Sequence, residues 1–213
     1  MKKNKKNNIV IELIHILSDW LLDNPYAFNY VRYILAGKQT GMKHFIKNNL
    51  KKYNSKTVGD FCCGTGDFAQ CCGRQMSYVG IDLNLSFINF ALKRYKNDKN
   101  KNFIASDVLQ LPYKGKTFDA LLLISAIHHL SDKELSILLP VIKRITKKVV
   151  IIADIIPDPP HLLQRFFVKL DRGRHIRPEK EKVRILSQYF KVVHTEMIPT
   201  RSAIQCGIIC EIK

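Results

Sequence analysis

Two glycines and several aspartates are spaced so that they could hold a nucleoside. Residues 58–69 read VGDFCCGTGDFA, in which a short apolar run containing Asp60 leads into Gly64 and Gly66. Glycine permits backbone angles and close approaches that a Cβ would obstruct, and amides at a following helix start can face an anionic or polar group. The next apolar run ends in Asp82, about 20 residues after the turn, as in a nucleoside-binding strand–helix–strand unit. A carboxylate in that position can accept hydrogen bonds from two ribose hydroxyls.

The ends of two further apolar runs carry polar groups that could join the same site. Asp107 follows the third run and precedes Val108, so a carboxylate could accept from an exocyclic amine beside an aliphatic wall. Ser125, His128 and His129 follow the fourth run. One of the histidines could act as a general base toward a hydroxyl or an acidic carbon. The alternative is a structural role, in which a histidine packs against or caps the next helix.

Alternating apolar runs and helical segments must position these groups. Strands are expected at 57–61, 78–82, 103–106, 118–124 and 149–155, and helices at 85–95 and 132–146. Asn84 and Ser131 are suitable N-caps for the two helices. This alternation predicts a parallel sheet covered on both faces, which binds ligands at the carboxyl ends of its strands. The tail is expected to add a helix and an antiparallel hairpin, at 180–189, 191–197 and 203–212.

The first 56 residues are expected to form a basic arm and a helical cap on a single compact domain at 57–213. Residues 9–22 follow the arm with a helical pattern, and two acidic residues inside it argue against a signal peptide. That helix either packs on the domain or lies on a membrane surface, which would suit a lipid-like substrate. Two more helices are expected at 24–35 and 42–52, the first carrying Tyr30 as a candidate substrate contact. Aromatic residues on helices more often belong to the core.

The composition fits a soluble, cytoplasmic protein of one domain. The chain has 213 residues, of which 46% are hydrophobic and 25% charged, and no apolar run approaches the roughly 18 residues that cross a bilayer. The formal net charge of +17 is unusual. It could serve nucleic acid, an anionic membrane or an acidic small substrate, or reflect only a lysine-rich surface, since the lysines are scattered.

The six cysteines predict neither a metal site nor a disulfide scaffold. Four stand in adjacent pairs, which cannot readily converge on one tetrahedral ion, and no CxxC spacing is present. A chain of this length and composition also does not resemble a small disulfide-rich domain. Reduced cysteines in a cytosolic protein are therefore expected.

Five segments together resemble the class I S-adenosylmethionine-dependent methyltransferases. The similarity is greatest to the small-molecule "methyltransferase type 11" group, which includes the ubiquinone and menaquinone biosynthesis enzymes. The segments are VGDFCCGTGDFA, YVGIDLN, ASDVLQLPY, FDALLLISAIHHL and VVIIADIIP, in order from residue 58 to residue 157. The resemblance implies an α/β, Rossmann-like sheet of seven strands, mostly parallel, with the last strand antiparallel. S-adenosylmethionine would be the methyl donor.

The same resemblance assigns roles to residues at the strand ends. Gly64 and Gly66 would approach the methionine part of the cofactor, and Asp82 would hold the ribose. Leu83 would pack on the adenine, Asp107 with Val108 would contact the adenine edge, and Ser125 would lie beneath the sulfonium. Asp60, Cys62 and Cys63 would complete the cofactor site. Cys62 departs from the family pattern D-x-G-x-G-x-G, which has glycine there, so weaker cofactor binding is expected.

The sequence gives less direct evidence for the methyl acceptor than for the donor. The segment 171–177, DRGRHIR, offers Arg172, Arg174 and His175 to a carboxylate or phosphate, although a solvated basic loop is an equal alternative. The fourth strand is followed by SAIHHL rather than [DN]PP[YF], and no cysteine stands near the end of the fourth or fifth strand to act as a nucleophile. A metal-binding carboxylate cluster of the catechol-methylating kind is also absent from the sequence. These features favour a small-molecule acceptor, lipophilic or anionic. The alternatives are an RNA methyltransferase that uses the basic surface, or a cofactor-binding protein without turnover.

Overall fold

The computed structural model describes residues 23–110, 115–171 and 173–213. Its centre is one seven-stranded sheet in the order β3-β2-β1-β4-β5-β7-β6. The first five strands are parallel, and β7 runs antiparallel to both β5 and β6, which confirms the predicted topology. The strands are β1 (Thr57–Phe61), β2 (Ser77–Asp82), β3 (Lys101–Ala105), β4 (Phe118–Ile124), β5 (Thr146–Ile155), β6 (Phe190–Pro199) and β7 (Ile204–Ile212).

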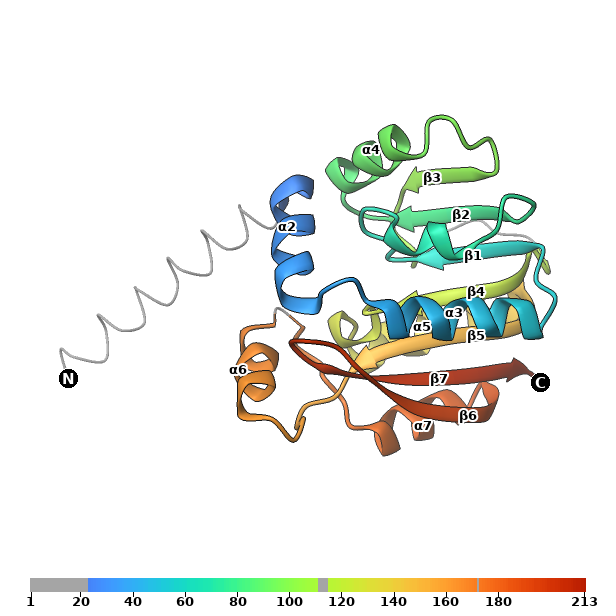
Figure 1. The fold of residues 1–213 in the computed structure, drawn as a ribbon. Coiled ribbons are helices and arrows are strands. Elements are labelled where there is room, and N and C mark those ends of the chain that lie inside the picture. The colour runs from blue at the N-terminus through green and yellow to red at the C-terminus, as the bar shows by residue number, and fades with distance from the viewer. Residues whose placement is uncertain (1–22, 111–114, 172) are drawn as a thin grey trace.

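Helices cover both faces of this sheet, as the alternation of elements predicted (Figure 1). Leu122 and Ile124 of β4 face a core shared with α3 and α4, whereas Leu121 and Leu123 face a core shared with α5 and α7. This alternation follows from the two-residue period of a strand. The helices are α2 (Pro25–Ala36), α3 (Thr40–Lys52), α4 (Leu85–Arg94), α5 (Asp132–Ile145), α6 (Leu162–Leu170) and α7 (Glu179–Ser187).

Two predicted helix starts are confirmed by their caps. The side chain of Asn84 accepts hydrogen bonds from the amides of Ser86 and Phe87, and Ser131 forms a capping box with Glu134. The helix expected after the glycine turn is only a short 3₁₀ segment, η1 (Asp67–Cys71). A second 3₁₀ turn, η2 (Ile127–His129), follows β4. These elements bring the turns that follow β1, β2 and β4 to one edge of the sheet.

Helix α6 is an element that the sequence patterns did not predict. It lies with α2 at the edge toward which β1 to β5 point, on the left of Figure 1. The predicted arm and first helix at 1–22 lie outside the described residues. Among the residues that the structure describes, no helix is long and apolar enough to cross a membrane. The division into a cap at 1–56 and a domain at 57–213 stays a prediction.

Candidate active site

The glycine loop is held open by Asp82. Its Oδ2 accepts a hydrogen bond from the Gly64 amide at 2.7 Å, and its Oδ1 accepts one from the Asn84 amide at 2.9 Å. Gly64 has a φ of 55°, and a Cβ built there would meet nothing within 4 Å, so open space lies beside it. Gly66 is required for a different reason, because its Cβ would stand 2.6 Å from the ring of Phe103. The loop is therefore tightly packed at Gly66 and open at Gly64.

Cys62 adopts a conformation that suits glycine. Its φ of 59° lies in the left-handed region, which costs a non-glycine residue roughly 1–2 kcal/mol. Burial, and then the charges of Asp82, Asp60 and Asp107, raise the pKa of its thiol to about 12. Cys62 is thus a protonated thiol among three carboxylates. The irregular position noted in the sequence is a strained one at the predicted cofactor site.

The side chains of Asp60 and Cys63 are buried and not exposed at the rim of the loop. Only 1% of Asp60 is exposed, and its carboxylate accepts a hydrogen bond of 2.6 Å from the Tyr78 hydroxyl inside the sheet. Burial raises its pKa to about 7, despite the Tyr78 hydrogen bond and with a contribution from the charge of Asp82. Cys63 is also buried, with its sulfur against Gly80. Both side chains point away from the rim: Asp60 is paired with Tyr78, and Cys63 packs in the hydrophobic core.

The predicted adenine-binding residues stand together after β2 and β3. Asp107 is half-buried and accepts from the Leu109 amide and, at 3.2 Å, from Gln110 Nε2. Val108 is buried, whereas Leu83 is 75% exposed at the end of β2. A large apolar side chain left this exposed beside Asp82 is suited to cover an aromatic ring. The placement of these residues is compatible with the predicted roles.

A cavity of about 360 Å³ lies on the other side of the glycine loop, at the carboxyl ends of β4 and β5. Ser125, with a φ of 50°, stands at its edge. Helix α2 forms one wall, α6 another, and the turn between β6 and β7 a third, and the lining is mainly apolar. The lining residues from the two helices are Phe28, Val31, Arg32, Leu35, Ala36, Phe167 and Val168.

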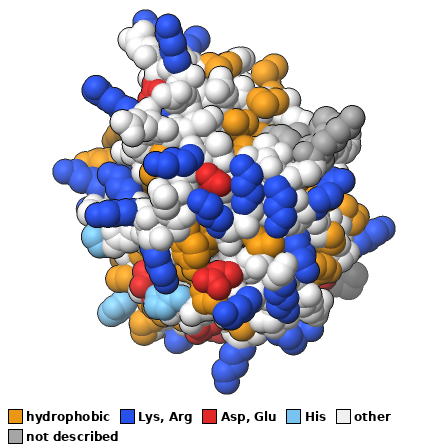
Figure 2. All heavy atoms as spheres, turned by 90° about the vertical axis from the view of Figure 1, so that its right-hand side faces the viewer, with side chains coloured by type: hydrophobic (Ala, Val, Ile, Leu, Met, Phe, Trp, Pro, Cys, Tyr) orange, Lys and Arg blue, Asp and Glu red, His pale blue; other side chains and the backbone are white. Residues whose placement is uncertain are grey.

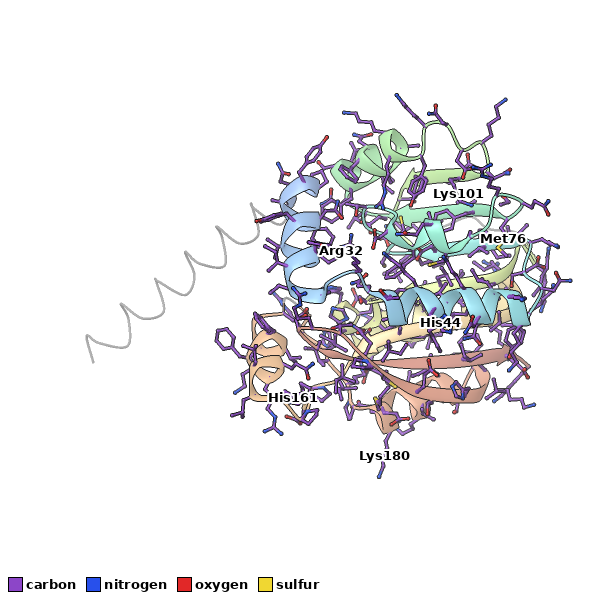
Figure 3. All side chains as sticks on the ribbon, viewed as in Figure 1. Arg32, His44, Met76, Lys101, His161 and Lys180 are labelled. Carbon is purple, nitrogen blue, oxygen red and sulfur yellow. The ribbon has the colours of Figure 1, made fainter. Side chains whose placement is uncertain are left out.

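Residues on the inner face of α2 contact the glycine loop and the segment that follows it. Arg32 projects from α2 toward the body of the domain (Figure 3), where its Nη1 lies 2.8 Å from Asp67 Oδ2. The Thr65 hydroxyl, within the glycine loop, donates to Asn29 at 2.9 Å. The same helix therefore contacts the glycine loop and walls the neighbouring cavity.

His128 is held between two carboxylates. Its Nδ1 lies 2.5 Å from Asp154 Oδ1, its amide donates to Asp154 Oδ2 at 2.9 Å, and its Nε2 lies 3.4 Å from Asp171 Oδ1. Burial alone would lower its pKa, but the charge and hydrogen bond of Asp154, and then those of Asp171, raise it to about 9. His128 is therefore an imidazolium at neutral pH. It cannot accept a proton in that state, which argues against the free base that the sequence suggested.

The two histidines differ in access. Both line the cavity, with ring centroids 4.0 Å apart, but His128 is only 2% exposed whereas His129 is exposed. The side chain of Asp171 also lines the cavity and is 34% exposed. Burial would raise the pKa of Asp171, but the hydrogen bond and charge of His128 hold it below its usual value. Asp171 and His129 are thus the titratable groups that an acceptor in the cavity could reach.

Among the described residues of the DRGRHIR segment, Arg174 and Arg177 do not line the cavity, and Arg177 instead supports the site from behind. Arg177, 5% exposed, donates to Asp132 and to the main-chain oxygens of Ile127, Leu130 and His175. The His175 amide donates to the His128 oxygen. A Cβ at Gly173 would clash with the His128 ring, so only glycine fits there. The segment clamps the turn that carries both histidines.

None of the described candidate substrate contacts lines the cavity. Arg174 is exposed, His175 is half-buried against η2, and Tyr30 is 68% exposed on the outer side of α2. Arg172 lies outside the described residues. The residues that the sequence did not single out are Asp171, which lies in a segment read as basic, and Gln205. Gln205 is 7% exposed, lines the cavity, and its Oε1 has no partner among the described residues.

Replacing Arg177 by Ala is expected to lower the free energy of unfolding by about 3 kcal/mol. The change leaves the oxygens of Ile127 and Leu130, and the Asp132 carboxylate, without this donor. Arg174→Ala, at an exposed position of the same segment, should change stability by no more than about 0.5 kcal/mol. Urea unfolding followed by circular dichroism checks both. Equal effects would show that Arg177 is not the clamp.

Comparison with known proteins supports the family resemblance seen in the sequence. Residues 58–149 match a family model described as a methyltransferase domain. Demethylmenaquinone methyltransferase of Lactobacillus johnsonii is 28% identical over 93 residues, which cover 40% of this chain and 38% of that protein. Fatty-acid O-methyltransferase of Mycolicibacterium smegmatis is 36% identical over 76 residues, 34% of this chain and 27% of that protein. The chain therefore covers well under half the length of the curated relatives it matches.

A solved structure extends the similarity of fold over nearly the whole chain. Magnesium protoporphyrin IX methyltransferase of Synechocystis PCC 6803, solved with bound SAH, superposes with a TM-score of 0.70. The match covers 94% of this chain and 100% of that chain at 18% identity. The family match at 58–149 supports the resemblance to the class I S-adenosylmethionine-dependent methyltransferases, and this superposition shows the same fold over nearly the whole chain.

Proposed function

We propose that this chain transfers a methyl group from S-adenosylmethionine to a small molecule with an apolar body. One observation carries the proposal: a mainly apolar cavity begins at Ser125, next to the glycine loop and the carboxylate of Asp82. The strand order β2-β1-β4-β5 sets Asp82, the loop and Ser125 side by side along one edge. A donor site and an acceptor site that share a border are what a methyl transfer requires.

The donor would be held by residues after the first three strands. Asp82 would accept from the ribose hydroxyls, Leu83 and Val108 would enclose the adenine, and Asp107 would bind its edge. When bound, the sulfonium supplies an electrophilic methyl group. The open space at Gly64 suits the approach of a ligand to the backbone. Cofactor binding should be weaker than with the family's glycine at position 62. The Cys62 backbone is strained there, and its side chain occupies space at the rim of the glycine loop.

The chain's own groups would then position the acceptor and remove its proton. Asp171 takes the proton that a hydroxyl or an acidic carbon loses as it gains the methyl group, and the His128 imidazolium fixes the carboxylate in place. Asp154 in turn fixes the imidazole. His129, which also lines the cavity, is the competing base. The unpartnered Gln205 oxygen suits a hydrogen-bond donor on the acceptor.

The cavity supports a small acceptor over RNA. Figure 2 shows Lys and Arg side chains spread over the face at the amino ends of the parallel strands, away from the cavity, rather than gathered in one block. The curated relatives are named for demethylmenaquinone and fatty-acid methylation, and both acceptors have long apolar parts.

The alternative RNA methyltransferase would require an affinity for RNA that falls steeply with salt. A protein without turnover would bind the donor and yield no demethylated product. All six cysteines are free, which supports a cytoplasmic site of action.

Asp82→Ala is expected to weaken binding of S-adenosylmethionine by at least about 100-fold, because two hydrogen bonds to a charged acceptor are lost. Calorimetry on the wild type and the variant measures this. Asp98→Ala is the matched control, since Asp98 accepts from an amide two residues later just as Asp82 does, but before β3. Unchanged affinity in Asp82→Ala would contradict the donor site.

A labelled-methyl assay on lipid, metabolite and RNA extracts tests the class of acceptor. Label in RNA alone would contradict the proposal of a small-molecule acceptor.

A further inference from the structure

The outward face of α6 is apolar and basic, which is unusual for a helix on the surface of a globular domain. Leu162, Leu163 and Phe166 are 80%, 63% and 56% exposed. The inward face is formed by Gln164 and Val168, each 7% exposed. The helix sequence LLQRFFVKL has two basic residues and no acidic residue. Its amphipathic pattern is therefore inverted, since large apolar side chains face outward.

Helix α2 carries a matching stripe of aromatic residues. Tyr26, Tyr30, Tyr33 and Ile34 follow one another at the spacing of one helix face, and they are 67%, 68%, 57% and 45% exposed. The opposite face contacts the glycine loop and the cavity through residues such as Arg32. Its sequence PYAFNYVRYILA also has no acidic residue. Tyrosine favours a boundary between water and an apolar phase, because its ring is apolar and its hydroxyl is polar.

The two outward faces belong to one edge of the molecule. Figure 1 shows α2 and α6 at the edge toward which β1 to β5 point. The inner faces of the same helices form opposite walls of the cavity. Arg201, in the turn between β6 and β7, donates to the main-chain oxygen of Ile34, so the third wall is tied to α2. The exposed apolar residues of α2 and α6 therefore lie on the outer faces of two helices that line the cavity.

We infer that the outer faces of α2 and α6 form a docking surface for a membrane that contains anionic lipids. We define this docking surface as Tyr26, Tyr30, Tyr33, Ile34, Leu162, Leu163, Arg165, Phe166 and Lys169. Apolar side chains can enter the boundary between headgroups and acyl chains, while Arg165 and Lys169 face the lipid phosphates. Basic side chains elsewhere on the chain add a general attraction, but the apolar stripes select which face turns to the membrane.

This orientation has a consequence for the acceptor that rests on the proposed function. A lipophilic molecule in the membrane would pass between α2 and α6 into the cavity without crossing water. The docking itself requires neither the methyl donor nor turnover. Its failure and the failure of the proposed function are therefore separate results.

Vesicle co-sedimentation with the full-length chain tests the docking surface. The wild type is expected to bind vesicles of phosphatidylcholine mixed with phosphatidylglycerol, and to bind pure phosphatidylcholine more weakly. Leu163→Ser with Phe166→Ser should lower the affinity for mixed vesicles at least about tenfold, because two exposed apolar side chains no longer enter the lipid. Leu92→Ser with Ile137→Ser is the matched control, at positions 45% and 47% exposed on α4 and α5, and should bind as the wild type does.

The basic residues are tested in the same way. Arg165→Gln with Lys169→Gln should lower affinity for mixed vesicles about 20-fold and leave binding to pure phosphatidylcholine unchanged. Lys96→Gln with Lys99→Gln, exposed before β3 at the far edge, should have a much smaller effect. The proposal is overturned if the wild type binds neither kind of vesicle, or if it binds and the variants on α2 and α6 do not weaken it. It is also overturned if the wild type dimerises without vesicles and the Leu163/Phe166 variant abolishes the dimer.

Discussion

Replacing Asp171 by Asn is expected to lower the rate of methyl transfer by about 10²- to 10⁴-fold, the usual loss on removing a general base. Asp171 lines the cavity with a partly exposed carboxylate, and His128 Nε2 lies 3.4 Å from that carboxylate. Asparagine keeps the size of the side chain but cannot accept the proton. Because the donor site lies on the other side of the glycine loop, binding of S-adenosylmethionine should change by less than about twofold.

The pH dependence separates this assignment from the alternative bases. In the proposed arrangement, Asp171 accepts the proton and the His128 imidazolium holds the Asp171 carboxylate in position. The rate is then flat near neutral pH and falls as the pH rises through about 9, the pKa of His128. If neutral His128 were the base, the rate would rise over the same range. His129→Gln is the matched variant at the cavity wall and should retain most of the activity. Loss of turnover in His129→Gln, with Asp171→Asn active, would assign the base to His129.

Asp154→Asn is expected to lower the free energy of unfolding by about 3–5 kcal/mol, since it breaks a buried ion pair and leaves the other charge uncompensated. Asp154 has no exposed surface, and its oxygens accept from His128 twice and from the Ile155 amide at 2.7 Å. Asparagine retains one oxygen, so the loss should come mainly from the imidazolium. Urea unfolding with a double-mutant cycle against His128→Gln isolates the pair. A coupling energy near zero would contradict the buried ion pair.

Stability should also depend on pH through this pair. The pKa of His128 is raised from 6.5 to about 9, so its contribution is fully present below pH 6.5 and is lost as the pH rises through 9. The size is on the order of 3 kcal/mol, from 1.36 kcal/mol per pKa unit. Asp60 acts in the same direction at lower pH, since its raised pKa makes ionisation costly between 3.8 and about 7. In Asp154→Asn the decrease between pH 6.5 and 9 should largely disappear.

The sequence predicts the mostly parallel sheet with its antiparallel last strand, and it indicates which residues are expected around the donor. Period-two apolar runs, caps such as Asn84, and the rule that parallel strands bind ligands at their carboxyl ends depend on local patterns. These patterns are visible in a single chain, and β1 and β4 begin and end where the sequence predicts. The roles given to Asp82 and Asp107 follow from the same rules and stay predictions, although the structure places both at the expected edge.

The tertiary structure decided which side chains reach the cavity. Nothing local shows that Asp60 turns inward to Tyr78, because a strand-end residue can face either way. The basic segment 171–177 looked like an anion site, yet Arg177 is buried in the clamp and Asp171 faces His128. Helix α6 follows a proline-rich stretch and buries only a narrow face, so its pattern gave no helix signal. Sequence determines local geometry, whereas the charge on His128 depends on Asp154, 26 residues away, and only the folded chain brings the two together.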